Sequence, residues 1–225
     1  MFCKRCNQFQ SIYLQQLNIK LIDNIKNVQR INCKICKTFI GVTEKHIIIN
    51  IDTTVNTYNE NGWKKANSDR DKIVYYILSQ IIYPEMDHPV KDKFESIYDC
   101  ADETDDIYLR WKQGIPVGFY TVKRKGTKIF NTPYAYSMNT LDTAYIRSKF
   151  RNKGLGLEIL YNVIENYPND DIGFSKPISE GMLRLLHKFL SKHKEFRLSF
   201  WEIENGGIEG SAKLIWFNLK KSGKN

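Results

Sequence analysis

The chain has 225 residues, and its 42% hydrophobic and 13% aromatic content is ordinary for a folded protein with a full α/β core. Its net charge of +9 favours anionic partners, such as an anionic cofactor, nucleic acid or an acidic surface. No apolar run approaches the roughly 18 residues that a membrane span requires, which argues against a membrane protein.

Two C-x-x-C pairs, Cys3 with Cys6 and Cys33 with Cys36, stand near the start of the chain. Four thiolates can close a tetrahedral zinc site, and the two-residue spacing lets each pair bind the metal from one turn. The 26 residues between the pairs exceed the spacing of the simplest zinc motifs but do not disqualify the site. We therefore predict a structural Zn²⁺ in a zinc-ribbon-like module over residues 1–45.

Disulfides and a redox pair are the competing explanations for these cysteines. No charged start followed by an apolar run precedes them, so we expect no signal peptide and an intracellular location, cytoplasmic or nuclear, where disulfides are disfavoured. A thioredoxin-like site would use one pair rather than two. His46 is a possible accessory ligand, although a packing role is the commoner one for such a histidine.

Nucleic-acid binding is an alternative that the basic residues of this module keep open, but no basic run of five or more residues supports it. The residues concerned are Lys4, Arg5, Lys34 and Lys37.

The rest of the chain alternates strand-like and helix-like segments. Residues 46–56 predict a strand, and residues 68–86 predict a helix that Ser68 caps together with Asp71 and that Pro84 ends. Residues 107–126 predict two strands joined by a turn. A strand over 141–150, a helix over 155–167 and a last sheet strand over 211–221 follow.

The hexapeptide Arg151-Asn-Lys-Gly-Leu-Gly156 lies where the predicted strand 141–150 gives way to the predicted helix. Glycines at such a turn remove the Cβ atoms that would keep a ligand from the backbone, and the first amides of the helix have no partner within it. These amides and the helix dipole favour a pyrophosphate, and Arg151 and Lys153 add positive charge. The simpler alternative is a turn that only starts a helix.

The stretch YIRSKFRNKGLGLEIL, from Tyr145 to Leu160, resembles the acetyl-CoA motif of the GNAT superfamily of N-acetyltransferases, which has Arg or Gln, two residues, Gly, one residue, then Gly or Ala. Residues 171–177 and 179–193 resemble the strand and helix that follow in that family. The resemblance covers residues 105–220. A narrower likeness, in KFRNKGLGLEIL, GFSKPIS and FWEIENGG, is to the soluble lamin-associated protein family.

This resemblance implies a fold and an activity. The fold is α/β, a mixed and mostly antiparallel sheet of six or seven strands, flanked by helices and splayed at the cofactor strand, with residues 46–225 as an acyl-CoA-binding domain. The activity is transfer of an acetyl group from acetyl-CoA to an amine, such as a protein lysine or N-terminus. The implied cofactor-binding residues are Ile146, Arg151, Asn152, Lys153, Gly154, Leu155, Gly156, Leu157 and Ser179.

The catalytic residues are less clearly marked. Asp142 shares a strand face with Ile146 and is a candidate base, with Glu202 or Glu204 as substitutes. The family's proton donor to the leaving thiolate is commonly a tyrosine on the helix 179–193, where this chain has none; Leu186 falls at its place, or His187 one residue later. Two alternatives to the enzyme therefore stay open: a weak or inactive GNAT-fold binding or scaffold protein, and a zinc-ribbon nucleic-acid binder.

Overall fold

The computed structural model describes residues 2–3, 5–9, 11–17, 19, 21, 28–44, 47–49, 60–208 and 210–222. His46, Lys4 and most of the predicted strand 46–56 lie outside these residues. The strands of the main sheet are β7 (Gly62–Lys65), β8 (Asp106–Lys112), β9 (Ile115–Lys123), β10 (Asn139–Ile146), β11 (Ile172–Ser175), β12 (Phe200–Ile203) and β13 (Ala212–Leu214).

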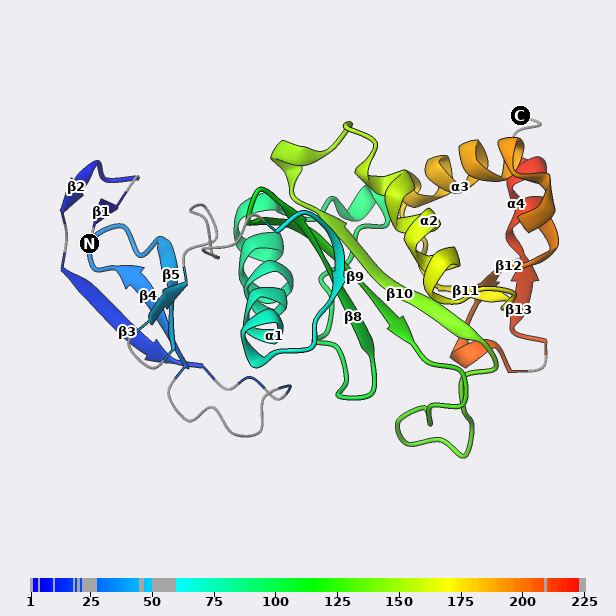
Figure 1. Ribbon diagram of the computed structural model, residues 1–225, viewed down its shortest axis with the longest axis horizontal. Coiled ribbons are helices and arrows are strands. Elements are labelled where there is room, and N and C mark those ends of the chain that lie inside the picture. Colours follow the sequence, from blue (N-terminus) through cyan, green and yellow to red (C-terminus); the bar gives the residue numbers. More distant parts are fainter. Residues whose placement is uncertain are drawn as a thin grey trace.

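Within the described residues these seven strands form one sheet in the order β13-β12-β11-β10-β9-β8-β7 (Figure 1). The pairs β10–β11 and β11–β12 are parallel and the others are antiparallel. Helices flank the sheet, and four cysteines cluster near the N-terminus. The predicted fold class is therefore confirmed.

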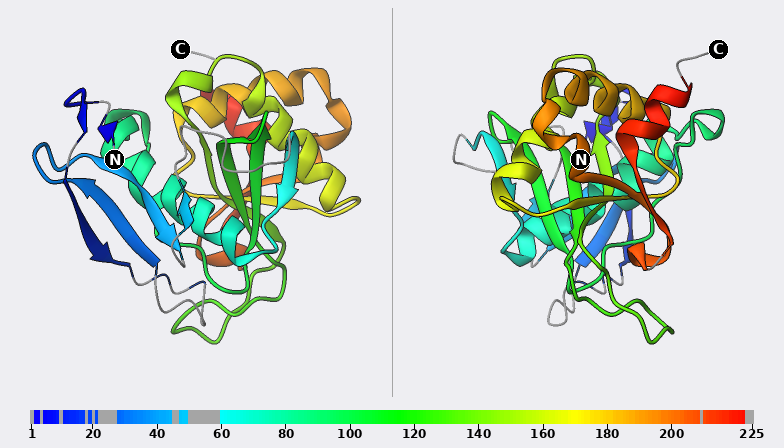
Figure 2. Two further views of the ribbon diagram at one scale, coloured as in Figure 1. Left: turned by 60° about the vertical axis from the view of Figure 1, so that its left-hand side comes forward. Right: turned by 90° about the vertical axis from the view of Figure 1, so that its right-hand side faces the viewer.

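Helices cover both faces of this sheet (Figure 2). One face packs against α1 (Asp69–Tyr76) and its continuation η1 (Ile77–Asp87), a π-helical segment. The opposite face packs against α2 (Leu155–Asn166), α3 (Glu180–Lys192) and α4 (Ile215–Ser222). Successive side chains of β8 point to opposite faces of the sheet and so join the hydrophobic cores on both faces. Ile107 and Leu109 face α1, whereas Tyr108 faces α2. Short 3₁₀ turns complete the helices: η2 (Lys91–Lys93), η3 (Ser148–Phe150), η4 (Lys194–Leu198) and η5 (Asn205–Gly207).

The N-terminal part has its own sheet, in the order β3-β4-β5-β6, beside a hairpin of two short strands. Its strands are β1 (Phe2–Cys3), β2 (Gln8–Phe9), β3 (Ile12–Gln16), β4 (Val28–Cys33), β5 (Phe39–Glu44) and β6 (Ile47–Ile49). The boundary predicted at residue 45 stays a prediction; β6 follows it and still pairs with β5.

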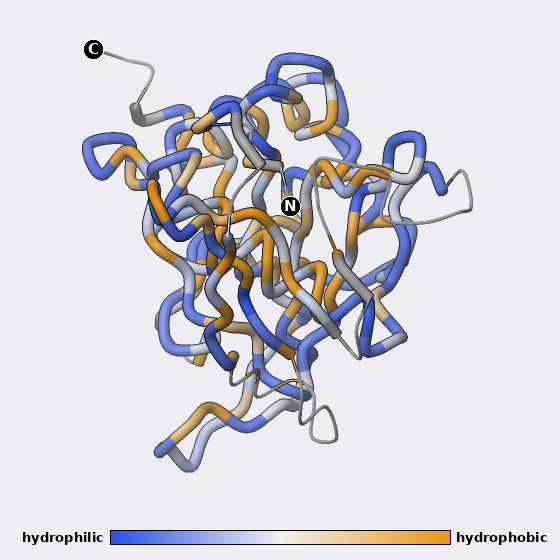
Figure 3. Tube along the Cα trace, turned by 90° about the vertical axis from the view of Figure 1, so that its left-hand side faces the viewer, coloured by the Kyte–Doolittle hydropathy of each residue, from blue (hydrophilic) through white to orange (hydrophobic). Residues whose placement is uncertain are grey.

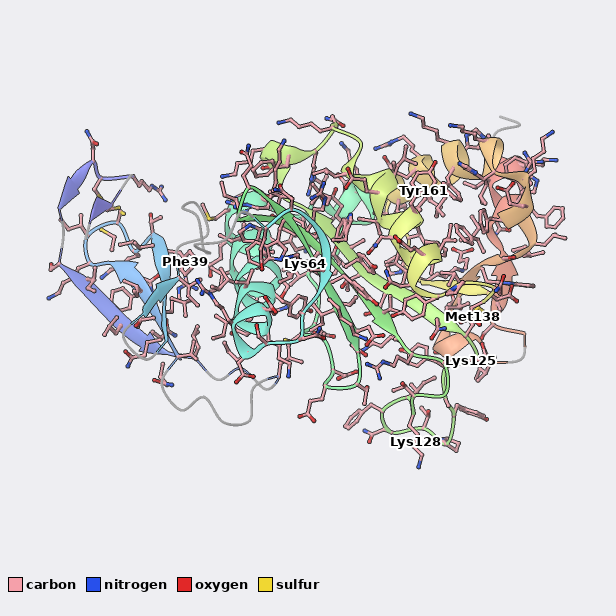
Figure 4. The ribbon with its side chains drawn as sticks, in the orientation of Figure 1. Phe39, Lys64, Lys125, Lys128, Met138 and Tyr161 are labelled. Carbon is pink, nitrogen blue, oxygen red and sulfur yellow. The ribbon has the colours of Figure 1, made fainter. Side chains whose placement is uncertain are left out.

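A shared hydrophobic core joins the N-terminal sheet to α1 and η1. Val28 and Val42 belong to the same buried cluster as Ile73 and Ile77. Phe39, labelled in Figure 4, lies between the N-terminal sheet and α1 and packs against this cluster.

Along the chain, hydrophobic segments run through the interior and hydrophilic ones follow the outer loops (Figure 3). No helix in the described ranges is long and apolar enough to cross a bilayer.

The first helix begins as predicted but does not end at Pro84. The Asp71 amide donates to Ser68 Oγ at 3.1 Å, and the Ser68 amide donates to Asp71 Oδ2 at 3.2 Å, which confirms the capping box. The helical path continues through Pro84 to Asp87. The prediction was wrong because the wider π-helical turns move the proline ring away from the carbonyl that it would meet in an α-helix.

Two predicted strands are shorter than expected. The strand over 141–150 ends at Ile146, and a 3₁₀ turn occupies Ser148–Phe150. The tail over 211–221 is a strand only over Ala212–Leu214, at the sheet edge, and continues as α4. Apolar residues at helical spacing in this tail pack on the core, which favours a helix over a strand.

Candidate functional site

The sheet opens between its two central parallel strands. Strands β10 and β11 pair only where Asn139–Leu141 of β10 lies beside 172–174 of β11. Beyond Leu141, β10 continues to Ile146 and pairs only with β9 among the described strands. The second half of β10 therefore presents a free edge to the gap.

The backbone of β10 determines which groups point into this gap. The Arg147 amide donates to the Val117 carbonyl of β9 at 3.0 Å. Because hydrogen bonding alternates along an antiparallel strand, the amides and carbonyls of Ala144 and Ile146 point the other way. The N–H groups of Ala144 and Ile146 therefore point into the gap from one strand. An extended, amide-containing ligand can accept hydrogen bonds from both.

Two side chains hold the outward carbonyls of this edge. The Tyr98 hydroxyl donates to the Ala144 carbonyl at 3.2 Å, and Arg151 Nε donates to the Ile146 carbonyl at 2.9 Å. Arg151, the first residue of the hexapeptide, is therefore tied to the strand that precedes it. This contact brings the hexapeptide and the free edge of β10 into one site.

Two clefts meet at the gap. The first, of about 700 Å³, lies between the end of β10 and the first turns of α2 and α3, and we call it the α2 cleft. The second, of about 510 Å³, lies on the other side of Ala144, beside β11, and we call it the β11 cleft. Tyr98, Ala144, Ser179 and Met182 line both clefts. The two clefts therefore share a wall at Ala144 and Tyr98.

The hexapeptide forms the turn that starts α2. Asn152 and Gly154 adopt positive φ values of 60° and 85°. The amides of Leu157 and Glu158 bond to the Gly154 carbonyl, at 3.0 and 3.3 Å, so the two amides before them are the ones available to a ligand. A Cβ built on Gly154 would meet nothing within 4 Å. Open space at this turn suits an anion.

Gly156 has a structural role that its sequence context does not show. A Cβ at this position would lie 2.5 Å from Leu185 Cδ1 of α3. The glycine therefore permits α2 and α3 to pack closely. Its presence does not by itself indicate a ligand.

The α2 cleft is cationic. Lys93, Arg151, Arg184 and Lys188 line it together with a single carboxylate, Glu95. Arg151 lies 3.6 Å from Glu95. The sequence did not indicate Arg184 and Lys188, because they come from α3 and only the packing of α3 on α2 brings them to the loop.

The predicted cofactor residues mostly gather at this cleft. Its lining includes Ile146, Arg151, Asn152, Gly154, Leu155, Gly156, Leu157 and Ser179. Lys153 is outside that lining and donates to the Lys149 carbonyl at 3.3 Å. Ser179 caps α3 by accepting from the Met182 amide at 3.3 Å.

Of the candidate catalytic side chains, only Asp142 lines a cleft. Ser175 Oγ donates to Asp142 Oδ1 at 2.7 Å in the β11 cleft. Glu202 accepts from Asn218 Nδ2 at 2.9 Å and is outside both linings, and so is its neighbour Glu204, which pairs with Lys176 at 2.9 Å.

Neither candidate position for the proton donor on α3 reaches the two clefts. His187 is exposed, stacks near Trp216 at 6.5 Å and is outside both linings. Leu186 is fully buried in the core.

Tyr98 is the residue that sequence reasoning missed. It stacks on Tyr83 with ring centroids 4.8 Å apart, at the junction of the two clefts. Burial and the neighbouring Tyr83 raise the pKa of Tyr98 well above its ordinary value, so its hydroxyl stays protonated at neutral pH. No motif marks Tyr98, which lies far from the hexapeptide in the sequence.

The four N-terminal cysteines form a compact cluster. Their sulfur atoms all lie within 4.8 Å of one another, with Cys3 3.6 Å from Cys36 and Cys6 3.9 Å from Cys33. Four thiolates at ~2.3 Å from a tetrahedral zinc ion would lie about 3.8 Å apart, so the cluster fits that metal. Hydrogen bonds with the hydroxyl and amide of Thr38 lower the pKa of Cys36 to about 6, whereas hydrogen bonding with Cys36 and burial raise the pKa of Cys6 to about 12. The metal-free cluster thus favours one thiolate, and a bound metal would displace the remaining protons.

Comparison with known proteins gives relatives whose names carry no activity. No protein-family model matches the chain. The chain is 29% identical to mouse Protein FAM169B over 196 residues, which cover 84% of this chain and 57% of that protein. It is 30% identical to human Protein FAM169BP over 120 residues, which cover 52% of this chain and 62% of that protein. The matched segments thus span less than two thirds of either relative.

One solved structure is similar in part. It is the crystal structure of an acetyltransferase from Vibrio fischeri, which matches 50% of this chain and 93% of its own with 18% sequence identity and a TM-score of 0.35. The class that fold and site define is thus a mixed α/β protein with an opened central sheet and an N-terminal four-cysteine cluster.

Proposed function

We propose that this protein is an acetyl-CoA-dependent N-acetyltransferase. The observation that carries the proposal is the opening between β10 and β11, which joins a cationic cleft to a second, acidic cleft at Ala144. A two-substrate transfer needs such a junction, because the reacting atoms of a donor and an acceptor must come within ~3–3.5 Å.

The α2 cleft would take acetyl-CoA, which supplies an activated acetyl group. The available amides at the start of α2 would bind its pyrophosphate, and Arg184 and Lys188 would add charge. The outward amides of Ala144 and Ile146 would pair with the amide-containing arm in the manner of a strand. The thioester would then lie beside Tyr98 and Ala144.

The β11 cleft would take the amine. Its lining carboxylates are Asp99, Asp102 and Asp142. Asp102 is paired with Lys123 and the other lining lysine, Lys176, with Glu204, so Asp99 and Asp142 would face the amine. An alkyl amine with a pKa near 10.4 is protonated at neutral pH and must lose a proton before it attacks. Asp142, oriented by Ser175, would accept that proton, directly or through water.

Tyr98 would assist the leaving thiolate. Because its pKa is raised, Tyr98 would donate a hydrogen bond rather than a full proton to a thiolate with a pKa near 8.5. Its single O–H would turn from the Ala144 carbonyl to the sulfur to do so. The chain thus has a hydroxyl at the junction although α3 has no tyrosine.

One alternative is favoured by a specific observation. Leu186 is buried and α3 supplies no tyrosine to the clefts, which fits a protein that binds the cofactor without turnover. Such a protein would be a binding or scaffold module on the same fold.

Calorimetric titration with acetyl-CoA tests the cofactor site. We expect the parent to bind and Lys188→Glu to bind roughly tenfold more weakly, since it reverses one charge in the cleft. Lys192→Glu is the matched control: it reverses an exposed charge on the same helix outside the cleft lining, and it should bind like the parent. No binding by a folded parent would reject the acetyltransferase.

A turnover assay distinguishes the proposed enzyme from the alternative binding or scaffold protein. We expect release of the CoA thiol in the presence of a lysine-containing peptide and acetyl-CoA, detected with a thiol reagent. Binding of acetyl-CoA without thiol release, across basic peptides, free N-termini and small amines, would support the binding module instead.

A further inference from the structure

Strand β3 is exposed along its whole length. All five residues from Ile12 to Gln16 are exposed, although three of them are apolar. Leu14 exposes 50% of its surface, and Ile35, in the metal-binding turn beside the strand, exposes 64%. Figure 1 shows β3 at the outer side of the N-terminal sheet, away from the main sheet.

The outer edge of β3 has backbone groups turned to solvent. The Leu17 amide donates to the Val28 carbonyl of the neighbouring chain segment at 2.9 Å. By the alternation of an antiparallel pair, the amides and carbonyls of Ile12 and Leu14 point away from β4. No strand in the described ranges pairs with this edge.

This edge lacks the features that usually prevent strand pairing. Exposed edge strands commonly carry a charged residue, a proline or a bulge. The sequence of β3 is Ile-Tyr-Leu-Gln-Gln, and its register with β4 is unbroken from Ile12 to Gln16. The strand is thus open to an added strand.

The charge of the N-terminal segment indicates the kind of partner. The first 43 residues contain seven lysines and arginines against one aspartate, a net charge of +6 out of +9 for the whole chain. Zinc with four thiolates would contribute −2 and leave the segment cationic. Lys37 Nζ lies 5.3 Å from the centre of the Tyr13 ring, which places positive charge directly on the β3 surface.

We infer that β3 binds an acidic, extended peptide segment of another protein by strand addition. Backbone pairing would come from Ile12 and Leu14, apolar contact from Leu14 and Tyr13, and charge attraction from Lys37 and Lys34. A second copy of this chain would bring the same cationic surface to the edge and be repelled. The site is separate from the two clefts and does not depend on the proposed activity.

The test uses the full, zinc-loaded chain and a fluorescent peptide of about ten residues with alternating glutamate and valine, long enough to form one strand. Fluorescence anisotropy should show saturable binding to the parent and roughly tenfold weaker binding to Leu14→Pro. The Pro ring removes the one outward N–H of residue 14, which the pairing with β4 does not use. Leu14→Thr keeps that N–H and should bind more tightly than Leu14→Pro.

Zinc content and thermal melting show whether Leu14→Pro is folded. If it is not, hydrogen exchange of the parent replaces it: added peptide should slow exchange at the amides of Ile12 and Leu14. Lys37→Glu should weaken binding of the acidic peptide.

Several results would overturn the inference. Equal binding by folded Leu14→Pro, no protection of the two amides, or equal binding of the same peptide with lysine in place of glutamate would each do so. Binding of a single-stranded oligonucleotide that is tighter than peptide binding and unaffected by Leu14→Pro would assign the surface to nucleic acid. Self-association of the parent in sedimentation, lost in Leu14→Pro, would assign it to a second copy.

Discussion

Asp142 is the carboxylate on which the proposed chemistry depends. Asp142→Asn keeps the size of the side chain but removes the base, so we expect kcat/KM for acetyl transfer to fall by ~10²–10³. Acetyl-CoA affinity should stay unchanged, because Asp142 lines the β11 cleft and not the α2 cleft. Steady-state kinetics with calorimetry measures both.

Ser175→Ala is the control for this variant. It removes the hydrogen bond that orients Asp142 but leaves the carboxylate, so its effect should be much smaller than that of Asp142→Asn. Equal activity of Asp142→Asn and the parent would remove Asp142 from the mechanism.

Tyr98 and Tyr83 are stacked, and we predict that only the Tyr98 hydroxyl assists the leaving thiolate. Tyr98→Phe removes the donor at Ala144, and we expect kcat to fall about tenfold or more while acetyl-CoA still binds. Tyr83→Phe removes the hydroxyl of the stacked ring and should change kcat less. Pre-steady-state measurement of thiol release in both variants distinguishes the roles of the two hydroxyls. Equal losses of rate would indicate that the two tyrosines contribute only by packing.

At the scale of elements, the end of η1 fastens the loop between β10 and α2. Asp87 accepts hydrogen bonds from the Tyr145 hydroxyl at 2.5 Å, the Ser148 amide at 2.6 Å and the Ser148 hydroxyl at 2.8 Å. Burial alone would raise the pKa of Asp87, but these bonds outweigh burial and lower it. One carboxylate thus connects η1, β10 and the start of the hexapeptide loop.

This arrangement predicts a pH-dependent contribution to stability. Because the folded pKa is lowered, the contribution of Asp87 is present above the unfolded pKa of about 4 and is lost as pH falls below it. Asp87→Asn should therefore lower the free energy of unfolding by ~1–2 kcal/mol at pH 7, and the difference should shrink at pH 3. Urea denaturation at both pH values measures this; an equal difference at both would contradict it.

Sequence patterns predicted elements well where one face of a segment is apolar. The helix beginning at Leu155 lies where the pattern placed it, because its buried residues recur at helical spacing. The hairpin of β8 and β9 also lies where it was predicted, although both strands are buried on both faces, because a turn separates two continuous strand-like runs. Pro84 and the tail after Leu214 were mispredicted, because the turns around Pro84 are π-helical and because the apolar residues of the tail follow helical rather than strand spacing. Tyr98 and Lys188 were missed, since they join the clefts only through folding.

At the scale of the whole molecule, the N-terminal module and the main sheet are mechanically connected. Arg30 of β4 contacts both carboxylate oxygens of Glu85 in η1 at 2.6 Å, and the two parts share one hydrophobic cluster. The same η1 segment contributes Tyr83 to the α2 cleft. Disorder in the N-terminal module should therefore weaken ligand binding in the α2 cleft.

Metal removal tests this connection. If zinc contributes ~3–5 kcal/mol, its chelation should lower Tm by roughly 10 °C for a chain of this size. Acetyl-CoA should also bind several-fold more weakly. Cys33→Ser should reproduce both effects and lose zinc, whereas Cys100→Ser, outside the cluster, should keep zinc and parental stability. Zinc loss without any change in Tm would refute a structural metal.

The contact between Gly156 and Leu185 bears on how glycine motifs are interpreted across evolution. Selection for close packing of α2 on α3 would retain Gly156 in a descendant that no longer binds any cofactor. The pattern of Arg, two residues, Gly, one residue and Gly can thus outlive the chemistry with which it is associated. Gly154 is held by its φ of 85° as well, so Asp142, which lines the β11 cleft, is the position where drift among relatives would record a loss of the proposed activity.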